Sequence, residues 1–197
     1  TRSTTDSLQN LAARQGTALA EVSSRPVKDW IFPVLNTSQN WYAEMLLKQL
    51  GRQFGGVGSW KAGLEVERRF LIDSMKVDST QFALRDGSGL SSSNLVSPKA
   101  FATLLTWMRA HPRFESFAAG LPQSGQRGSL KSRFVGTPLE GKVRAKTGSI
   151  SRVNTLAGYI ELPGRTLTFA VEANNHTLGS RVMIPQIDSL VVQMGKK

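Results

Sequence analysis

Apolar and charged residues alternate most regularly in the last third of the chain, and this alternation predicts three consecutive β-strands. Residues 142–150 place charged side chains between apolar ones, which is the pattern of a half-buried strand at the edge of a sheet. Two further strand-like runs follow at residues 153–162 and 165–174, and a Pro-Gly turn at residues 163–164 joins them. The sequence therefore predicts a three-stranded antiparallel meander.

Most of the remaining chain carries apolar residues at the spacing of amphipathic helices. Ser59 is placed to cap one of these helices, and Ser97 followed by Pro98 marks the start of another. Pro33 is expected to kink or end the second helical segment, and Gly51 to end the third. The helices predicted on this basis span about residues 6–16, 26–35, 41–50, 60–75, 98–111 and 180–194.

The other segments complete the prediction of the fold class. Short strands are predicted at residues 17–22 and 82–85, a polar break at 36–40, loops at 55–58 and 86–90, and irregular structure at 113–141. Helices followed by three consecutive strands and a final helix indicate an α+β domain in which helices cover an antiparallel sheet. No repeat or linker divides the chain, so we expect residues 1–197 to belong to one domain.

Composition supports a globular protein and narrows its chemistry. Hydrophobic residues make up 40% and charged residues 20% of the chain. No apolar run approaches the length that spans a membrane, and the start has no signal-peptide pattern. The net charge of +11 favours polyanionic partners such as nucleic acid, anionic lipid or acidic cell-wall polymers, although a well-solvated basic surface has the same charge. The absence of cysteine excludes disulfides and thiolate metal sites.

Several common catalytic patterns are missing from the sequence. The two histidines, His111 and His176, lie at a helix end and in a loop, where surface roles are commoner than catalytic ones. There is no Gly-x-Ser-x-Gly elbow, no His-x-x-x-His pair and no conspicuous pair of carboxylates. We therefore expect neither a Ser-His-Asp hydrolase nor a metal site, and no cofactor.

The first strand of the meander carries Lys146-Thr147-Gly148 and then Ser149. A lysine ammonium and two hydroxyls suit a carboxylate ligand. Gly148 has no Cβ, so another backbone or a ligand can approach the strand closely there. The alternative interpretation is a surface lysine that precedes a bulge glycine.

Two Ser-x-Asn tripeptides are present, at residues 38–40 and 92–94. The first is favoured because Ser38 lies in a short break between two helical segments, which would hold it rigidly. Asn40 has an alternative role as the cap of the helix that begins near Trp41.

Four separated stretches resemble one family, in that family's order along the chain. They are residues 38–47, 86–91, 125–130, and 145–150 continuing into 156–159, and the similarity extends from about residue 25 to residue 175. The family is that of class C low-molecular-mass penicillin-binding proteins, the D-alanyl-D-alanine carboxypeptidase/endopeptidases of the penicillin-binding protein 4 type. Serine penicillin-recognising enzymes carry Ser-x-x-Lys, Ser-x-Asn and Lys-Thr-Gly. The resemblance implies an incomplete penicillin-binding/β-lactamase-like transpeptidase domain.

The resemblance also implies a catalytic role for three residues. Ser38 would relay a proton to the leaving D-alanine nitrogen, and the ammonium of Lys146 would polarise the Ser38 hydroxyl. Asn40 would hydrogen-bond the acyl-side amide of the substrate and help to position the family's nucleophile-activating lysine. These roles require the turn at residues 38–40 and the Lys-Thr-Gly strand to share one cleft.

Four further residues would bind the substrate. The Thr147 and Ser149 hydroxyls would hold its terminal carboxylate, and the backbone N–H of Ser149 would be one of two oxyanion-hole donors. Gly148 would let the peptide stem lie along the strand edge as an added strand, and Leu90 would line the opposite side of the pocket.

The chain departs from the family pattern at the nucleophile. No serine or threonine stands three residues before any lysine, so Ser-x-x-Lys is absent. The resemblance therefore implies that this is the C-terminal portion of the enzyme, that the isolated chain is inactive, and that its helical region exposes apolar surface. The expected partners are the peptidoglycan stem peptide, β-lactam antibiotics in the intact enzyme, and the missing N-terminal part of the same protein. The expected location is the periplasm or cell envelope.

Two other functions remain open from the sequence. A non-catalytic module could use the basic surface to bind cell-wall polymer or nucleic acid. Against nucleic acid, the aromatic residues are not interleaved with lysine and arginine clusters. A β-lactamase of the same superfamily would share Lys-Thr-Gly but fits the surroundings of Asp86 and of residues 42–44 poorly.

Overall fold

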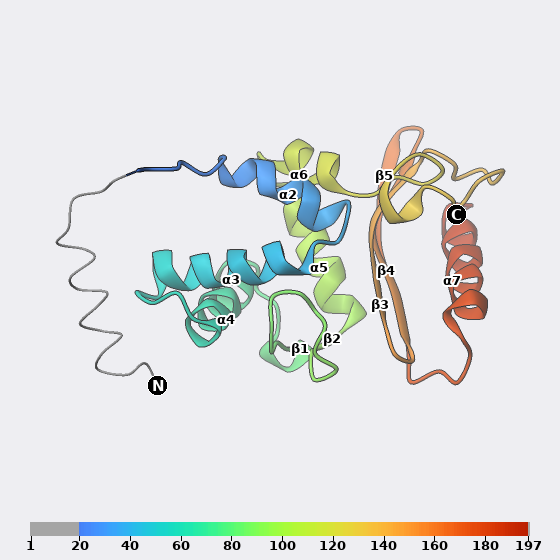
Figure 1. Cartoon of the computed structure of the whole chain (residues 1–197). Helices are drawn as coiled ribbons and strands as arrows, with labels where there is room; N and C mark the ends of the chain where they lie inside the picture. Colours follow the sequence, from blue (N-terminus) through green and yellow to red (C-terminus); the bar gives the residue numbers. More distant parts are fainter. Residues whose placement is uncertain (1–19, 197) are drawn as a thin grey trace.

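The computed structural model describes residues 20–196 of the chain (Figure 1). The predicted helix at residues 6–16 lies outside this part. The predicted strand at residues 17–22 lies partly outside this part as well. Residues 20–22 are described and have no regular secondary structure, so the strand prediction is wrong for these three residues. Within residues 20–196, no helix is both long and apolar enough to cross a membrane.

The predicted meander is confirmed as a three-stranded antiparallel sheet. Strands β3 (Val143–Ile150), β4 (Val153–Leu162) and β5 (Arg165–Asn174) lie in the order β3-β4-β5, so β3 is an edge strand. In the register of β3 and β4, Gly148 lies opposite Thr155 and Ser149 lies opposite Asn154. This register places the Lys-Thr-Gly sequence near the end of β3 that turns into β4.

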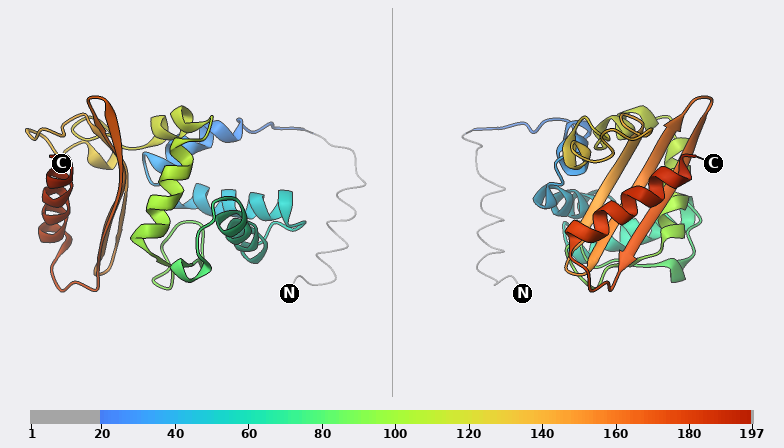
Figure 2. Two further views of the ribbon diagram at one scale, coloured as in Figure 1. Left: turned by 180° about the vertical axis from the view of Figure 1, so that it is seen from behind. Right: turned by 90° about the vertical axis from the view of Figure 1, so that its right-hand side faces the viewer.

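Helices lie on both faces of the sheet, as the α+β prediction requires (Figure 2). Helix α7 (Ser180–Met194), predicted with the same bounds, packs on one face and closes the main core against β3, β4 and β5. Helix α5 (Pro98–Arg109) packs on the other face, where the Tyr159 hydroxyl of β4 donates to the Leu105 carbonyl at 2.8 Å. The buried members of the main core are Leu130, Phe134, Leu139, Val143, Ala145, Leu156, Ile160, Phe169, Ile187 and Val191.

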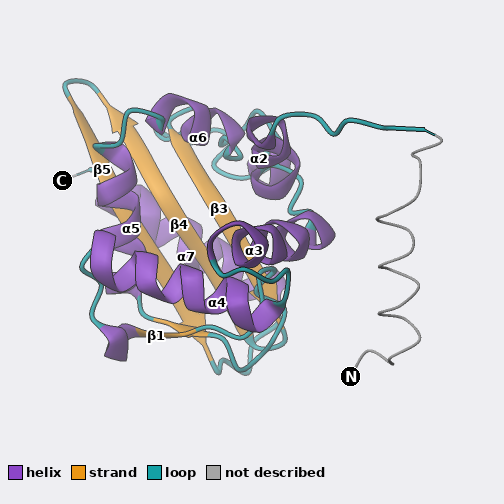
Figure 3. Cartoon of the chain, turned by 90° about the vertical axis from the view of Figure 1, so that its left-hand side faces the viewer, coloured by secondary structure: helices purple, strands orange, loops and turns teal. Residues whose placement is uncertain are grey.

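The remaining helices form a layer on the α5 side of the sheet (Figure 3). The first helical segments are α2 (Val27–Leu35), α3 (Asn40–Phe54) and α4 (Trp60–Arg69), and α4 continues into a π-helical turn, η1 (Phe70–Ser74). The short 3₁₀ turn η2 (Ser79–Gln81) and helix α6 (Phe114–Gly120) complete this layer. A second 3₁₀ turn, η3 (Gly128–Leu130), precedes β3, and its Leu130 is buried in the core on the α7 side. Helix α6 falls in the segment that was predicted to be irregular.

One predicted helix end is wrong, for an identifiable reason. Helix α2 ends at Leu35, as predicted, and Pro33 does not end it, since Asn36 N–H still donates to the Phe32 carbonyl at 2.8 Å. Helix α3 passes through Gly51, which is buried against α4; a Cβ on Gly51 would lie 2.7 Å from the nitrogen of Gly63. Gly51 is therefore a packing residue at a close helix crossing, and Gly55 caps the helix instead.

The predicted caps at the starts of α4 and α5 are confirmed. Ser59 Oγ accepts from Ala62 N–H at 3.2 Å, and Ser97 Oγ accepts from Ala100 N–H at 3.1 Å. The strand predicted at residues 82–85 is shorter, since β1 (Phe82–Ala83) pairs over two residues with β2 (Leu95–Val96), which was not predicted.

Candidate functional site

The edge strand β3 meets the turn between α2 and α3 at a direct side-chain contact. Lys146 Nζ donates to Ser38 Oγ at 2.9 Å, although the two residues are 108 positions apart in the sequence. The same ammonium donates to the Thr147 carbonyl at 2.8 Å. The structure therefore brings together the Ser-x-Asn turn at residues 38–40 and the Lys-Thr-Gly strand.

The turn holds Ser38 in an unusual backbone conformation. Its φ angle is +58°, in the left-handed region that costs a non-glycine residue roughly 1–2 kcal/mol. Both neighbours are fixed to the carbonyl of Pro33, which accepts from the Thr37 hydroxyl at 2.9 Å and from Gln39 N–H at 3.1 Å. These two bonds keep the turn closed and present the Ser38 side chain to β3.

Lys146 is partly buried, and the loss of hydration lowers the pKa of its ammonium. Both of its acceptors are neutral oxygens. Within residues 20–196, no carboxylate lies within 4.0 Å of this ammonium. The positive charge is therefore not matched by an acid of the described chain, and it is available to an anionic ligand.

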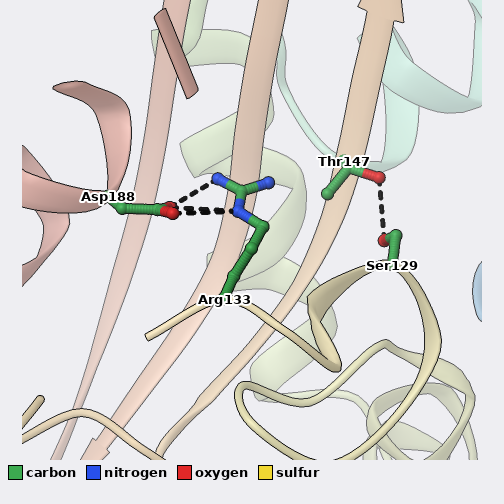
Figure 4. A network of polar contacts seen from close by, with 4 residues as sticks. All are labelled: Ser129, Arg133, Thr147 and Asp188. Atoms are coloured by element: carbon green, nitrogen blue, oxygen red, sulfur yellow. Dashed lines mark hydrogen bonds and ion pairs between the residues drawn. The ribbon is translucent and has the colours of Figure 1, made fainter. Parts of the chain in front are cut away.

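Thr147 and Ser149 lie on the other face of β3, toward α7, because side chains alternate along a strand. Thr147 Oγ1 and Ser129 Oγ are 2.9 Å apart (Figure 4), and Asn154 Nδ2 donates to Ser149 Oγ at 2.8 Å. The two hydroxyls border a cavity of about 170 Å³. It is lined by Ser129, Arg133, Thr147, Gly148, Ser149, Asn154, Thr155, Ile184 and Ile187. An anion at the strand edge can thus be reached from both faces of β3.

Two neighbouring contacts fix the walls of this cavity. The guanidinium of Arg133 forms an ion pair with the carboxylate of Asp188, which ties the loop before β3 to α7 (Figure 4). Ser129 belongs to a turn whose Gly128 has φ of +63°; a Cβ there would lie 2.9 Å from the Asn36 carbonyl. The turn that carries Ser129 is therefore packed on the turn that carries Ser38.

Gly148 has a structural reason to be glycine that the sequence did not reveal. An added Cβ would lie 2.4 Å from Oγ1 of Thr155, its cross-strand partner on β4. The space on this side of the glycine is occupied by the protein itself. Its predicted role in admitting a substrate backbone is therefore not needed to explain the residue.

Asn40 is the first residue of α3 and is exposed. The N-cap is Gln39, whose side chain makes no capping hydrogen bond, so the alternative in which Asn40 caps the helix is wrong. Leu90 is 58% exposed on the loop at residues 86–91. Neither Asn40 nor Leu90 lines the cavity beside Thr147.

The loop that carries Leu90 is organised by two carboxylates. Asp86 accepts from Gly89 N–H at 2.6 Å and from Ser91 N–H at 2.7 Å. Glu44 of α3 accepts from Ser88 N–H at 3.0 Å and from the indole N–H of Trp60 at 2.7 Å. Burial tends to raise the pKa of Glu44, but these hydrogen bonds outweigh it and lower the pKa.

Sequence reasoning missed Ser129, Glu44 and Asn154 as members of this site. Ser129 and Glu44 do fall inside the stretches that resemble the family, and that was their one available signal. Asn154 is a buried polar residue within a strand, and its partner could be found only from the register of β3 and β4.

An antiparallel sheet between helices, with Lys-Thr-Gly on its edge strand in contact with a Ser-x-Asn turn, defines a protein of the penicillin-recognising serine enzyme class. Residues 3–194 match the D-Ala-D-Ala carboxypeptidase 3 (S13) family, and the chain belongs to this family. The predicted family and fold class are thereby confirmed.

The similar proteins are longer than this chain. A D-alanyl-D-alanine carboxypeptidase of Actinomadura sp. (strain R39) is 37% identical over 164 residues, which are 81% of this chain and 30% of that protein. Penicillin-sensitive carboxypeptidase A of Dictyostelium discoideum is 31% identical over 189 residues, 89% of this chain and 35% of that protein. The chain thus spans about a third of the length of these relatives.

Solved structures show the same relationship. The structure of penicillin-binding protein 4 from Haemophilus influenzae, complexed with a β-lactam, superimposes with a TM-score of 0.77 at 28% identity. The match covers 84% of this chain and 38% of that one. In this comparison, too, the chain corresponds to part of a larger protein.

Proposed function

We propose that this chain supplies the Ser-x-Asn and Lys-Thr-Gly elements of a serine-type D-Ala-D-Ala carboxypeptidase/endopeptidase. The whole enzyme would act on peptidoglycan stem peptides through an acyl-enzyme, in the periplasm or cell envelope. The observation that carries the proposal is the 2.9 Å bond from Lys146 Nζ to Ser38 Oγ, which joins the two motifs at one place. Membership of the S13 family supports the same reaction.

Ser38 is the proposed proton carrier. Because the Ser38 oxygen accepts a hydrogen bond from the ammonium of Lys146, its own hydroxyl hydrogen is free to point into the site. It donates that hydrogen to the leaving D-alanine nitrogen as the carbon–nitrogen bond breaks. As Ser38 gives up its proton, the ammonium of Lys146 replaces it along the existing hydrogen bond, and the lowered pKa of Lys146 favours this release. Asn40, at the start of α3, is the proposed partner of the acyl-side amide.

The terminal carboxylate of the substrate is the proposed ligand of β3. The Thr147 and Ser149 hydroxyls are the donors, and the charge of Lys146 attracts the anion to the strand edge. The backbone N–H of Ser149 serves as an oxyanion-hole donor, a role worth about 10²–10³ in rate in other acyl-transfer enzymes. Leu90, on the loop at residues 86–91 that Glu44 bonds to α3, is the proposed contact on the other side of the site.

The nucleophile must come from outside these 197 residues, because no Ser-x-x-Lys is present in them. We propose that a segment bearing Ser-x-x-Lys packs on the helical layer, where α3 leaves Trp41 and Phe54 exposed. The isolated chain is then expected to be inactive.

Labelling with a fluorescent penicillin tests this proposal. The isolated chain should take up no covalent label, whereas a protein that joins it to the Ser-x-x-Lys segment should be labelled. In that longer protein, Lys146→Ala should slow acylation by both penicillin and peptide, while Lys142→Ala, in the turn just before β3, should not. A labelled band from the isolated chain, or unchanged acylation in Lys146→Ala, would contradict the assignment.

A further inference from the structure

A chain of hydrogen bonds runs from Ser149 into the protein and ends at a histidine. Asn154 of β4 is 1% exposed; its Nδ2 lies 2.8 Å from Ser149 Oγ, and its Oδ1 lies 3.1 Å from Nε2 of His176. The other ring nitrogen, Nδ1, lies 2.7 Å from the carbonyl of Leu178. His176 lies in the loop between β5 and α7, so its contact with Ser149 of β3 is indirect and passes through Asn154 of β4.

The hydrogen-bond partners of His176 determine which of its ring nitrogens carry a hydrogen. The Leu178 carbonyl can only accept, so Nδ1 of His176 must be protonated. With the Asn154 amide as placed, Nε2 also faces an acceptor, Oδ1. A ring that donates from both nitrogens is an imidazolium. With the amide in this orientation, the contacts fit a ring that donates from both nitrogens.

A neutral His176 requires the hydrogen bonds of the Asn154 amide to run in the opposite direction. Its Nε2 is then an acceptor, and the Asn154 amide must turn over to offer Nδ2 to the ring and Oδ1 to Ser149. Because Asn154 is buried, both ends of the amide need partners in either state. The amide therefore transmits the protonation of the ring to Ser149.

The two directions leave Ser149 with different capacities. When His176 is charged, Ser149 Oγ accepts from Asn154 and its hydrogen is free to donate to a carboxylate. When His176 is neutral, the Ser149 hydrogen is donated to Oδ1 of Asn154, and only oxygen lone pairs face the ligand. A carboxylate is held in the first state and repelled in the second.

The surroundings of His176 contain one other charged contact. Arg152, in the turn between β3 and β4, donates from Nε to the His176 carbonyl at 3.4 Å, and its own carbonyl accepts from His176 N–H at 3.3 Å. Within residues 20–196, no carboxylate lies within 4.0 Å of the imidazole. Lys146 points to the other face of β3, toward Ser38. No described carboxylate is therefore in direct contact with His176, and a carboxylate bound at β3 would add a negative charge on this side of the strand.

We propose that His176 and Asn154 are positioning residues that set the hydrogen-bonding direction of the Ser149 hydroxyl, so that carboxylate binding at β3 is coupled to protonation of His176. The proposal rests on the carboxylate-binding role of Ser149 in the proposed function and adds a pH dependence to it. Histidine is the side chain most often used to sense pH near neutrality, so the test compares pH values on both sides of 7.

Nitrogen-15 NMR of the two histidine rings tests the hydrogen-bond chain in the ligand-free protein. At pH 8, His176 should show the tautomer protonated on Nδ1, and Asn154→Ala should weaken that preference. His111, at the end of α5, serves as the internal reference. A neutral His176 protonated on Nε2 would overturn the proposal without any ligand being added.

Titration with N-acetyl-D-Ala-D-Ala tests the coupling. We expect binding to tighten about tenfold from pH 7.5 to pH 5.5, the effect of about one hydrogen bond to a charged group. The dipeptide should also move the His176 nitrogen shifts toward the cationic pattern. His176→Gln should remove this pH dependence, and His111→Gln should leave it unchanged. Binding that is equally tight at both pH values would overturn the coupling alone, whereas no binding at either pH would overturn the carboxylate site and the coupling with it.

Discussion

The two sides of the sheet are packed to different degrees. On the α7 side, core residues such as Val143, Leu156 and Val191 are fully buried. On the other side, α3 leaves the large apolar side chains of Trp41, Met45, Leu50 and Phe54 exposed, whereas α7, of the same length, exposes only Val182 and Leu190 of this kind. The apolar residues exposed between α2 and the start of α4 are Val27, Phe32, Trp41, Met45, Leu50, Phe54, Val57 and Trp60.

This difference divides the site into two halves. We call the part on β3, which rests on the closed core, the finished half, and the part on the Ser38 turn and its adjoining helices the open half. The strand that carries Lys146, Thr147 and Ser149 rests on a closed core, so its geometry is fixed by residues of the described chain. The turn that carries Ser38 adjoins helices with a large exposed apolar face, and such faces are typical of surfaces that bind another segment or protein. The proposed nucleophile-bearing segment would complete the second half.

The largest expected effect is a difference in stability between truncations on the two sides of the sheet. Leu156→Ala removes a fully buried side chain from the closed core and should lower the free energy of unfolding by about 3–4 kcal/mol. Trp41→Ala, a larger truncation at a residue 70% exposed, should change it by less than about 0.5 kcal/mol. Urea denaturation of both variants measures the contrast. Equal losses would mean that the helical layer is as well packed as the α7 side.

Glu67 provides a pH-dependent test of the open half. Burial without a compensating partner raises the pKa of this α4 carboxyl to about 7. The folded chain therefore keeps a proton that the unfolded chain releases above its ordinary pKa of 4.5. Its contribution to stability is full below pH 4.5 and falls as the pH rises to about 7, by roughly 2–3 kcal/mol.

Unfolding of the wild type and of Glu67→Gln should be compared between pH 4.5 and pH 8. The difference between them isolates this carboxyl from the other titrating groups, and Gln should be the more stable at high pH. Glu65→Gln is the matched control, because Glu65 is an exposed residue of the same helix paired with Arg69 at 3.9 Å. A constant difference across the range would show that Glu67 ionises normally.

Gly148→Ala tests the finished half at the site itself. The added methyl group would meet Thr155 Oγ1 at 2.4 Å, and such overpacking costs about 1–3 kcal/mol. Thr155→Ala removes the obstructing oxygen, so the double variant should recover most of the loss. A double-mutant cycle by urea denaturation measures the coupling between the two positions. Additive effects would mean that Thr155 is not the reason for glycine at position 148.

The sequence predicted the finished half of the molecule better than the open half. The three strands and α7 were predicted nearly residue by residue, because period-two alternation and the turn at residues 163–164 are local signals. The bounds of α3 were not, because Gly51 looks like a helix end and is in fact a contact with Gly63. That contact depends on tertiary packing, which no local pattern encodes.

The candidate site was predicted where a family resemblance supplied it. Ser38 and Lys146 are 108 residues apart, so spacing alone could not place them together. Ser129, Asn154 and His176 were missed because their roles depend on which segments become neighbours. The reason for glycine at position 148 was missed on the same ground, since Thr155 becomes its partner only through strand register.

The smallest expected effect concerns the turn that joins the two halves. Ser38→Ala and Ser38→Gly both remove the hydroxyl that bonds Lys146, but only glycine adopts a φ of +58° without steric cost. Glycine also gains entropy in the unfolded chain, which offsets part of that advantage. We expect Ser38→Gly to be more stable than Ser38→Ala by about 0.5–1 kcal/mol in thermal or urea unfolding. If the glycine variant equals or exceeds the wild type, then serine is kept at this position at a cost to folding, which is the expected mark of a functional residue. If alanine is the more stable of the two variants, the left-handed conformation at position 38 carries no steric cost in this turn.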